Sequence, residues 1–212
     1  MTQPACPADL SAKARRATAE ARARRRAVFL DRDGTLIEER GYLDRLELLS
    51  IFPWTADALR LLKRAGFATV VITNQSAIAR RIIDEAFLAQ VHREIDGRLA
   101  PGGGVIDAYY HCPHLPDAPD ERYRQACRCR KPGPGMIEQA CRDLHLDPAG
   151  SVMIGDRWLD VACGAAAGTR TVLVRTGHGG HEADVPPAGI RADAILNNLM
   201  EATGWMLRTS AR

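Results

Sequence analysis

Residues 28–36 read Val-Phe-Leu-Asp31-Arg-Asp33-Gly34-Thr35-Leu, an apolar run that ends in two carboxylates one residue apart. The run predicts a buried strand, and Gly34 predicts a turn directly after it. Ligands bind at the carboxyl ends of the strands in an open α/β sheet, because the loops that leave those ends form a crevice. Of two acids placed there, one can act as a nucleophile or metal ligand while the other donates a proton. This stretch therefore predicts a catalytic site.

An Asp-x-Asp-Gly sequence also occurs in ordinary loops and in calcium-binding loops. A calcium loop of the usual length that began at Asp31 would need a bidentate Glu at its last position, which is Tyr42. The sequence therefore favours a catalytic strand end over a calcium site.

Strand-like and helix-like segments alternate along the chain. We expect strands over residues 27–30, 68–73, 108–111, 152–154 and 171–174, and helices over residues 56–65, 84–99, 136–144 and 159–167. Such alternation is typical of a parallel sheet with helices on both faces. We therefore expect an α/β fold, a Rossmann-like three-layer sandwich with a mainly parallel sheet.

Positive charge is concentrated at the N-terminus. The 212-residue chain has a formal net charge of +3, and residues 1–26 carry more than this whole excess. We expect a basic, flexible tail over residues 1–26, which could form a fraying helix, bind an acidic partner or do neither, and one folded domain over residues 27–212. Because the basic residues form no stripe across the domain, we expect no nucleic-acid partner.

No segment is typical of secretion or membrane insertion. The tail lacks the apolar core of a signal peptide, and no run approaches the roughly 18 apolar residues of a membrane span. We therefore expect a cytoplasmic monomer that does not bind membranes.

Two close pairs of metal-ligand residues lie in one segment, Cys112 with His114 and Cys127 with Cys129. Three thiolates and one imidazole suit tetrahedral zinc. The lack of a nearby carboxylate ligand favours a structural four-ligand site over unpaired thiols or a disulfide. We therefore expect a zinc ion to pin a loop over residues 110–131 beside Arg130.

The remaining histidines and cysteines in the domain have simpler interpretations. His111 is expected to be a bystander of the zinc site, and His178 and His181 to be surface loop residues. Cys141 and Cys163 lie on helix-like segments and are expected to be small buried apolar residues.

Polar residues also follow or precede the other predicted elements. Thr73-Asn74-Gln75-Ser76 ends the second strand, Arg130-Lys131 precedes the third helix and Gly155-Asp156-Arg157 ends the fourth strand. Each has an ordinary explanation alone, since Thr73 could end a strand, Lys131 could be solvated and Asp156 could cap a helix. Together they suit phosphoryl transfer to a carboxylate, with magnesium on hard oxygen ligands and a lysine on the phosphoryl oxygens.

The order of these residues resembles the four motifs of the haloacid dehalogenase-like phosphatase superfamily: Asp31-x-Asp33-Gly34-Thr35, then Thr73, Lys131, and Gly155-Asp156 followed by Asp160. Residues 29–35, 71–80 and 110–136 are similar to its D-glycero-D-manno-heptose 1,7-bisphosphate 7-phosphatase family, and the similarity runs from about residue 27 to 177. The resemblance implies a magnesium-dependent phosphatase that removes the C7 phosphate of a sugar bisphosphate for lipopolysaccharide or nucleotide-activated heptose synthesis. It implies a protein without a cap domain, because no insertion after Asp33 or Lys131 is long enough for one.

The same resemblance implies roles for individual residues. Asp31 would form an aspartyl-phosphate, and Asp33 would protonate the leaving oxygen and then activate water. Thr73 and Lys131 would steady the phosphoryl group. Asp31, the backbone carbonyl of Asp33 and Asp156 would hold Mg²⁺. Substrate contacts are implied for Asp31, Arg32, Asp33, Glu39, Arg40, Gly41, Tyr42, Thr73, Asn74, Gln75, Ser76, Arg130, Lys131 and Arg157.

The chain departs from this family at Ala77, Arg81 and Arg157, where the family has Gly, Gly and Lys. Histidinol-phosphate phosphatase is an alternative, because it resembles the same motifs and has a similar zinc loop. A second phosphate needs more cationic contacts, which Arg80, Arg130 and Arg157 favour. A polynucleotide 3′-phosphatase is a further alternative, although the domain lacks clustered aromatic residues for stacking single strands. A phospho-receiver domain is disfavoured because the Asp pair follows the first strand.

Overall fold

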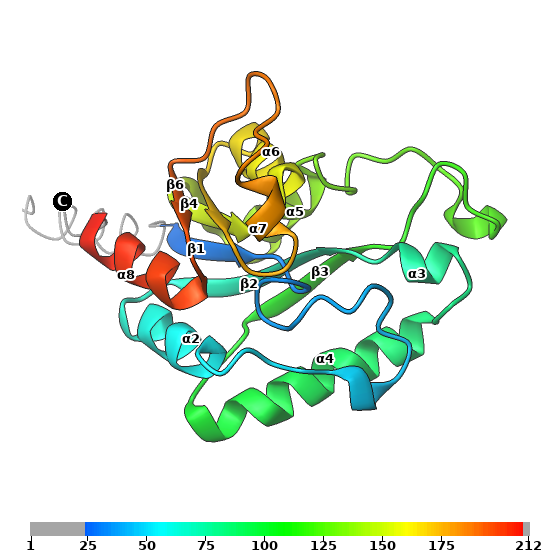
Figure 1. Ribbon diagram of the computed structural model, residues 1–212, viewed down its shortest axis with the longest axis horizontal. Coiled ribbons are helices and arrows are strands. Elements are labelled where there is room, and N and C mark those ends of the chain that lie inside the picture. Colours follow the sequence, from blue (N-terminus) through cyan, green and yellow to red (C-terminus); the bar gives the residue numbers. More distant parts are fainter. Residues whose placement is uncertain (1–23, 210–212) are drawn as a thin grey trace, which may run out of the picture.

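The computed structural model describes residues 24–209, and its centre is one six-stranded sheet in the order β3-β2-β1-β4-β5-β6 (Figure 1). Every neighbouring pair of strands is parallel, which confirms the predicted parallel sheet. The strands are β1 (Arg25–Leu30), β2 (Ala68–Asn74), β3 (Ala108–Cys112), β4 (Leu146–Gly155), β5 (Arg170–Val174) and β6 (Ala194–Leu196).

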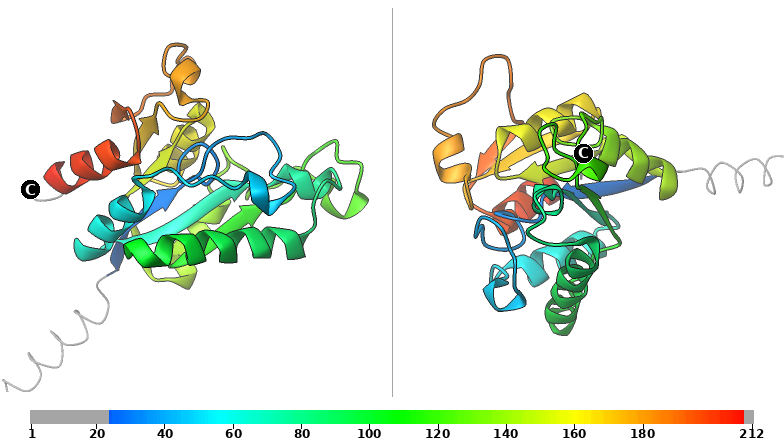
Figure 2. Two further views of the ribbon diagram at one scale, coloured as in Figure 1. Left: turned by 60° about the horizontal axis from the view of Figure 1, so that its bottom comes forward. Right: turned by 90° about the vertical axis from the view of Figure 1, so that its right-hand side faces the viewer.

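Helices cover both faces of the sheet (Figures 1 and 2). One face packs against α2 (Thr55–Arg64), α4 (Glu85–Leu99) and α8 (Leu199–Thr209), and the other against α5 (Gly135–Asp143) and α6 (Trp158–Ala166). Side chains alternate between the faces of a strand, so Val28 and Leu30 of β1 join the first core and Phe29 joins the second. The three-layer α/β prediction is therefore confirmed.

Short elements connect the layers. They are η1 (Leu46–Leu48), α3 (Ser76–Ala79), η2 (Ala100–Gly102), η3 (Glu121–Tyr123) and α7 (Gly179–Glu182). The 31–54 segment between β1 and α2 contains only η1, and no separate domain interrupts residues 24–209.

The observed elements differ from the predicted ones mainly at the two ends of the chain. β1 begins at Arg25, so two residues of the expected tail belong to the sheet, while residues 1–23 of that tail lie outside the described residues. The sequence patterns missed β6 and α8. β6 has three residues that are all at least partly exposed, which gives no clear apolar run. α8 places Leu199, Ala202 and Met206 in the core shared with α2.

The order of the strands decides where the site forms. The chain proceeds from β1 outward to β2 and β3, and then returns to the other side of β1 with β4. The carboxyl ends of β1 and β4 are therefore neighbours at the point where the strand order reverses, the usual ligand site of such sheets. Asp31 follows β1, and Asp156 follows β4.

Across residues 24–209, helices that are both long and apolar enough to cross a membrane are absent.

Candidate active site

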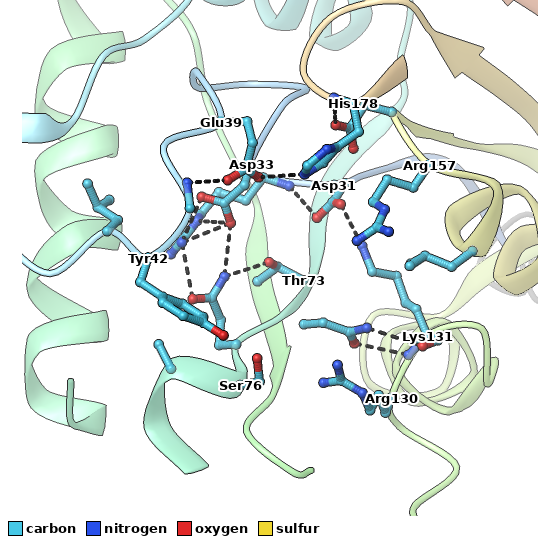
Figure 3. A pocket seen from close by; sticks show the side chains of 18 residues that line it. Asp31, Asp33, Glu39, Tyr42, Thr73, Ser76, Arg130, Lys131, Arg157 and His178 are labelled. Atoms are coloured by element: carbon cyan, nitrogen blue, oxygen red, sulfur yellow. Dashed lines mark hydrogen bonds and ion pairs between the residues drawn. The ribbon is translucent and has the colours of Figure 1, made fainter. Parts of the chain in front are cut away.

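A small pocket opens at the carboxyl ends of β1, β2 and β4 (Figure 3). Its volume is about 160 Å³, well below the range of roughly 300–1,000 Å³ for pockets that enclose a drug-sized ligand. The lining residues are Asp31, Arg32, Asp33, Glu39, Gly41, Tyr42, Leu43, Thr73, Asn74, Gln75, Ser76, Ala77, Arg130, Lys131, Asp156, Arg157, Leu159 and His178. All residues that the sequence placed in catalysis or on magnesium are therefore brought together.

Lys131 occupies the floor of the pocket, and its side chain is 1% exposed. Its Nζ lies 2.8 Å from Oδ2 of Asp31 and 2.6 Å from Oδ1 of Asp160, and it donates to the carbonyl of Ile72 at 3.0 Å. Burial alone would lower the pKa of Lys131, but the charges of Asp160 and Asp31 outweigh it and raise that pKa. Lys131 is therefore a buried, charged ammonium group.

Asn74 holds the Lys131 backbone. Its Oδ1 accepts from the Lys131 amide at 3.0 Å, and its Nδ2 donates to the Lys131 carbonyl at 3.2 Å. The Asn74 side chain, which was expected to contact substrate, thus orients Lys131. Its position in the sequence did not predict this contact.

Three buried carboxylates meet beside Lys131. Asp31, Asp156 and Asp160 each offer an oxygen within 4.8 Å of the others. Burial outweighs the opposing charge of Lys131 and, with the charge of Asp160, raises the pKa of Asp31 to about 7. Burial and the charges of Asp31 and Asp160 raise the pKa of Asp156 to about 8. When ionised, three carboxylates beside one ammonium would leave an excess of negative charge, which a divalent cation with oxygen ligands would balance.

The loop after β5 closes over this acid cluster. The amide of His178 donates to Oδ2 of Asp156 at 2.7 Å, and Oγ1 of Thr176 donates to the carbonyl of Gly34 at 2.6 Å. Gly34 has φ +74°, and a Cβ there would lie 2.1 Å from Oδ2 of Asp156. Only glycine therefore allows the turn after Asp33 to pass so close to the acid cluster.

Asp33 lies beside the cluster, and its side chain is 20% exposed. Nε and Nη2 of Arg32 donate to its two oxygens at 3.1 and 3.0 Å, and Nε2 of Gln75 donates to Oδ2 at 3.0 Å. Thr73, which is 1% exposed, accepts a hydrogen bond from the same Gln75 nitrogen at 2.8 Å. The two acids of the Asp31-x-Asp33 pair thus have separate partners, Lys131 for Asp31 and Arg32 for Asp33.

The Cys112, His114, Cys127 and Cys129 side chains form the second metal-ligand cluster. Their sulfur and Nδ1 atoms lie 3.0–3.6 Å apart in the five pairs that approach most closely. Tetrahedral zinc with Zn–S bonds of about 2.3 Å separates its sulfur ligands by roughly 3.8 Å, so the cluster is consistent with a zinc site after a slight expansion. His111 is outside the cluster, as expected, with Nε2 2.7 Å from Oε2 of Glu85.

Within residues 24–209, the two cysteines outside the cluster were expected to be buried. Cys163 is buried, and its Sγ donates to the carbonyl of Gly133 at 3.2 Å. Cys141 is only partly buried, because it lies near the exposed end of α5.

The rim of the pocket comes from loops. Nη1 of Arg130 donates to the carbonyl of His114 at 3.1 Å, so a residue of the Cys/His cluster orients a pocket arginine. Arg157 is about half exposed and lies 3.3 Å from Glu182. Tyr42 and Glu39 line the opposite side. Arg40, expected as a substrate contact, is not among the lining residues and pairs with Glu38.

His178 lines the pocket, although the sequence indicated only a surface loop residue. It is exposed, with Nε2 3.7 Å from Oε2 of Glu39, but the backbone of its loop is anchored on Asp156 and Gly34. A signal existed in the sequence, since His178 follows the end of a predicted strand by a short glycine-containing loop. The predicted crevice did not include the end of that strand.

Comparison with known proteins agrees with this geometry. The HAD-hydrolase-like family matches residues 128–202. The D-glycero-beta-D-manno-heptose-1,7-bisphosphate 7-phosphatase of Escherichia coli O6:H1 is 43% identical over 176 residues, which cover 82% of this chain and 90% of that protein. The protein of the same name from Haemophilus ducreyi is 41% identical over 184 residues, which cover 86% of this chain and 98% of that protein.

A solved structure is similar over nearly the whole fold. The D,D-heptose 1,7-bisphosphate phosphatase from B. bronchiseptica, complexed with magnesium and phosphate, has a TM-score of 0.76 and 32% identity, covering 87% of this chain and 99% of that one. The absence of a cap insertion in residues 24–209 agrees with this coverage. The chain belongs to the D-glycero-beta-D-manno-heptose-1,7-bisphosphate 7-phosphatase family of HAD-like hydrolases.

Proposed function

We propose that this protein is a sugar bisphosphate phosphatase that removes the C7 phosphate of D-glycero-β-D-manno-heptose 1,7-bisphosphate, leaving the 1-phosphate and inorganic phosphate. The observation that carries the proposal is the pairing of Asp31 with Lys131 in a buried acid cluster at the sheet's reversal point, in a chain of this family. The β anomer follows the names of the relatives.

Asp31 is proposed as the nucleophile. One of its carboxylate oxygens attacks phosphorus, and the bond from phosphorus to the C7 oxygen breaks. Asp33 gives a proton to that departing oxygen. The product of this step is an aspartyl-phosphate on Asp31 and the free sugar 1-phosphate.

Water completes the reaction. Asp33, now a carboxylate, takes a proton from a water molecule that attacks the phosphorus, and the bond to Asp31 breaks to release inorganic phosphate. Lys131 and Thr73 stabilise the charge on the phosphoryl oxygens in both steps, because their positions on the pocket floor are held by neighbouring groups.

Magnesium is proposed as the cofactor of this site. Asp31, the backbone carbonyl of Asp33 and Asp156 would hold it, and Asp160 would position Lys131. The excess of carboxylates over cations in the cluster supports this assignment. Bound there, Mg²⁺ would neutralise charge on the phosphoryl group.

Zinc is proposed for the Cys112, His114, Cys127 and Cys129 cluster. A four-ligand site of this composition is structural in most proteins. Through the bond from Arg130 to the carbonyl of His114, zinc would keep the rim arginine in place.

The rim is proposed to select the substrate. Because the pocket holds about 160 Å³, the transferred phosphoryl group fills it and the sugar with its second phosphate extends over the rim. Arg130 and Arg157 lie on that rim and offer guanidinium groups for the second phosphate. Glu39, Gly41, Tyr42 and Ser76 would contact the sugar.

The test is phosphate release with Mg²⁺ from the two anomers of heptose 1,7-bisphosphate, histidinol phosphate and a 3′-phosphorylated oligonucleotide, compared as kcat/KM. A preference of at least about tenfold for the β-heptose supports the proposal. A preference for histidinol phosphate or the oligonucleotide would agree with the proposed mechanism but refute the proposed substrate. Release from none of them would overturn the activity.

A further inference from the structure

We propose that Arg32 and Gln75 are positioning residues that hold the Asp33 carboxylate in the orientation needed for proton transfer to the leaving group. The inference rests on the proposed function, because it takes Asp33 as the proton donor. It assigns Arg32 and Gln75 a role that differs from the substrate contacts expected from the sequence.

Arg32 is buried although it lies between two active-site acids in the sequence. Its side chain is 3% exposed, against about half for the rim residue Arg157. Nε and Nη2 grip both oxygens of Asp33, a bidentate geometry that fixes the plane of the carboxylate. Among the described residues its third nitrogen, Nη1, has no hydrogen-bond partner and is buried. Arg32 lines the pocket, but Nε and Nη2 of its guanidinium are both engaged by Asp33 and Gln75.

Gln75 completes a ring of three side chains. Its Oε1 accepts from Nη2 of Arg32 at 3.1 Å while its Nε2 donates to Oδ2 of Asp33 at 3.0 Å. Each member of the ring thus contacts the other two. Gln75 is 5% exposed, so solvent does not compete for these bonds.

The ring is anchored to the sheet on two sides. The same Nε2 donates to Oγ1 of Thr73 in β2, and the Gln75 amide donates to the carbonyl of Cys112 at the end of β3 at 2.8 Å. On the β1 side, the Arg32 amide donates to Oδ1 of Asp31 at 2.7 Å. The position of Asp33 relative to Asp31 is therefore set by contacts to three strands and not by its loop alone.

This geometry bears on the chemistry because a proton donor must lie within hydrogen-bond reach of the leaving oxygen. Without the ring, a partly exposed Asp on a loop would sample several rotamers. Loss of the ring should therefore reduce proton donation to a poor leaving group. It should matter little for a leaving group that departs without a proton.

The test is a leaving-group series on Arg32→Lys and Gln75→Leu. The substrates are the sugar bisphosphate and aryl phosphates of decreasing leaving-group basicity, down to 2,4-dinitrophenyl phosphate, with kcat/KM reporting the first irreversible step. For Arg32→Lys we expect a loss of about 100-fold on the sugar substrate and less than about 10-fold on dinitrophenyl phosphate. Gln75→Leu leaves the arginine fork in place, so we expect the same trend with a loss of about 10-fold on the sugar substrate.

A second readout separates positioning from general damage. With dinitrophenyl phosphate the variants should give a rapid burst of the phenol followed by slow turnover, because the second step still needs Asp33 to activate water. The matched control is Arg122→Lys, which alters a similar bidentate contact to Asp120 outside the pocket. Its kcat/KM values across the leaving-group series should equal those of the wild type. Thermal melting and zinc content establish that each variant is folded, and Gln75→Leu serves if Arg32→Lys does not fold.

An equal loss for all leaving groups, or no loss, would overturn the positioning role. Failure of the wild-type protein on the sugar bisphosphate would overturn the proposed substrate instead, while the aryl phosphates would still report on the ring.

Discussion

The floor and the rim of the pocket are built in different ways. On the floor, the buried Lys131 Nζ lies 2.8 Å from Asp31, which follows β1, and 2.6 Å from Asp160 in α6. On the rim, Tyr42, Arg157 and His178 are exposed side chains on loops, and the backbone amides of Arg157 and His178 donate to Asp160 and Asp156 of the floor. Burial makes the floor electrostatically strong and sterically rigid, which suits bond making and breaking. Exposure makes the rim adaptable, which suits the choice of a substrate.

Asp31→Asn is the change to the floor with the largest expected effect. It removes the nucleophile while keeping nearly the same shape, so we expect turnover to fall by at least about 10³-fold and the fold to survive. Phosphate release and thermal melting are the two measurements. Activity within tenfold of wild type would show that Asp31 is not the nucleophile, and the proposed division between a catalytic floor and a selective rim would then fail.

Cys129→Ser connects the two regions through the zinc loop. We expect the zinc content to fall from one ion per chain toward none, and the melting temperature to fall by several degrees, since a structural zinc ion contributes directly to folding. Metal analysis and melting measure both effects, with Cys141→Ser as the matched control because Cys141 lies outside the cluster. Unchanged zinc in Cys129→Ser would refute the ligand set.

Arg130→Ala tests the rim alone. Removal of a guanidinium from the second phosphate should raise KM by roughly 10-fold to 100-fold and leave kcat within a few-fold, because the floor is intact. Arg142→Ala, an exposed arginine of α5 outside the pocket, is the control. A fall in kcat with unchanged KM would show that Arg130 acts in the chemical step, as the floor residues do, and not in substrate binding.

The pH dependence of stability tests the electrostatics of the floor. The folded, magnesium-free protein holds protons on Asp31 and Asp156, whose pKa values are raised from 3.8 to about 7 and about 8. The unfolded chain loses these protons near pH 3.8, so this contribution to stability is fully present below that pH and is lost progressively as the pH rises through 7 to 8. The slope is at most about 1.4 kcal/mol per pH unit for each proton.

His92 has the opposite effect at lower pH. Burial and then the charge of Arg32 lower its pKa from 6.5 to about 3, so its contribution is lost as the pH falls below 6.5. The acids are therefore tested above pH 6.5, where His92 does not contribute. The melting temperature of the magnesium-free protein should fall from pH 6.5 to 8.5, and addition of Mg²⁺ should raise it again. Asp156→Asn should flatten the slope, and a rising melting temperature in the parent protein would contradict the raised pKa values.

Local sequence patterns predicted Asp31 and Asp156 as members of the floor because they follow strands that are short apolar runs. Residues 28–30 are buried on both faces of the sheet, so they show no alternation, and the acids begin where the run stops. The Cys/His spacing likewise predicted the cluster. The same approach missed His178, whose pocket position depends on the path of the loop after β5, and it did not show that the Arg40 side chain pairs with Glu38.

The sequence by itself determined which segments form β1 to β5 and which chemical groups stand at their ends, because apolar runs and the spacing of acids are local properties of the chain. The tertiary structure alone decided which group each side chain meets. Lys131 lies between Asp31 and Asp160, and Arg32 turns to Asp33 and Gln75. Lys131, Asp160 and Gln75 come from segments far from residues 31–33 in the sequence, so these distances exist only after the strands are ordered in the sheet. Those distances set the charge balance of the floor, and with it the chemistry that the pocket can perform.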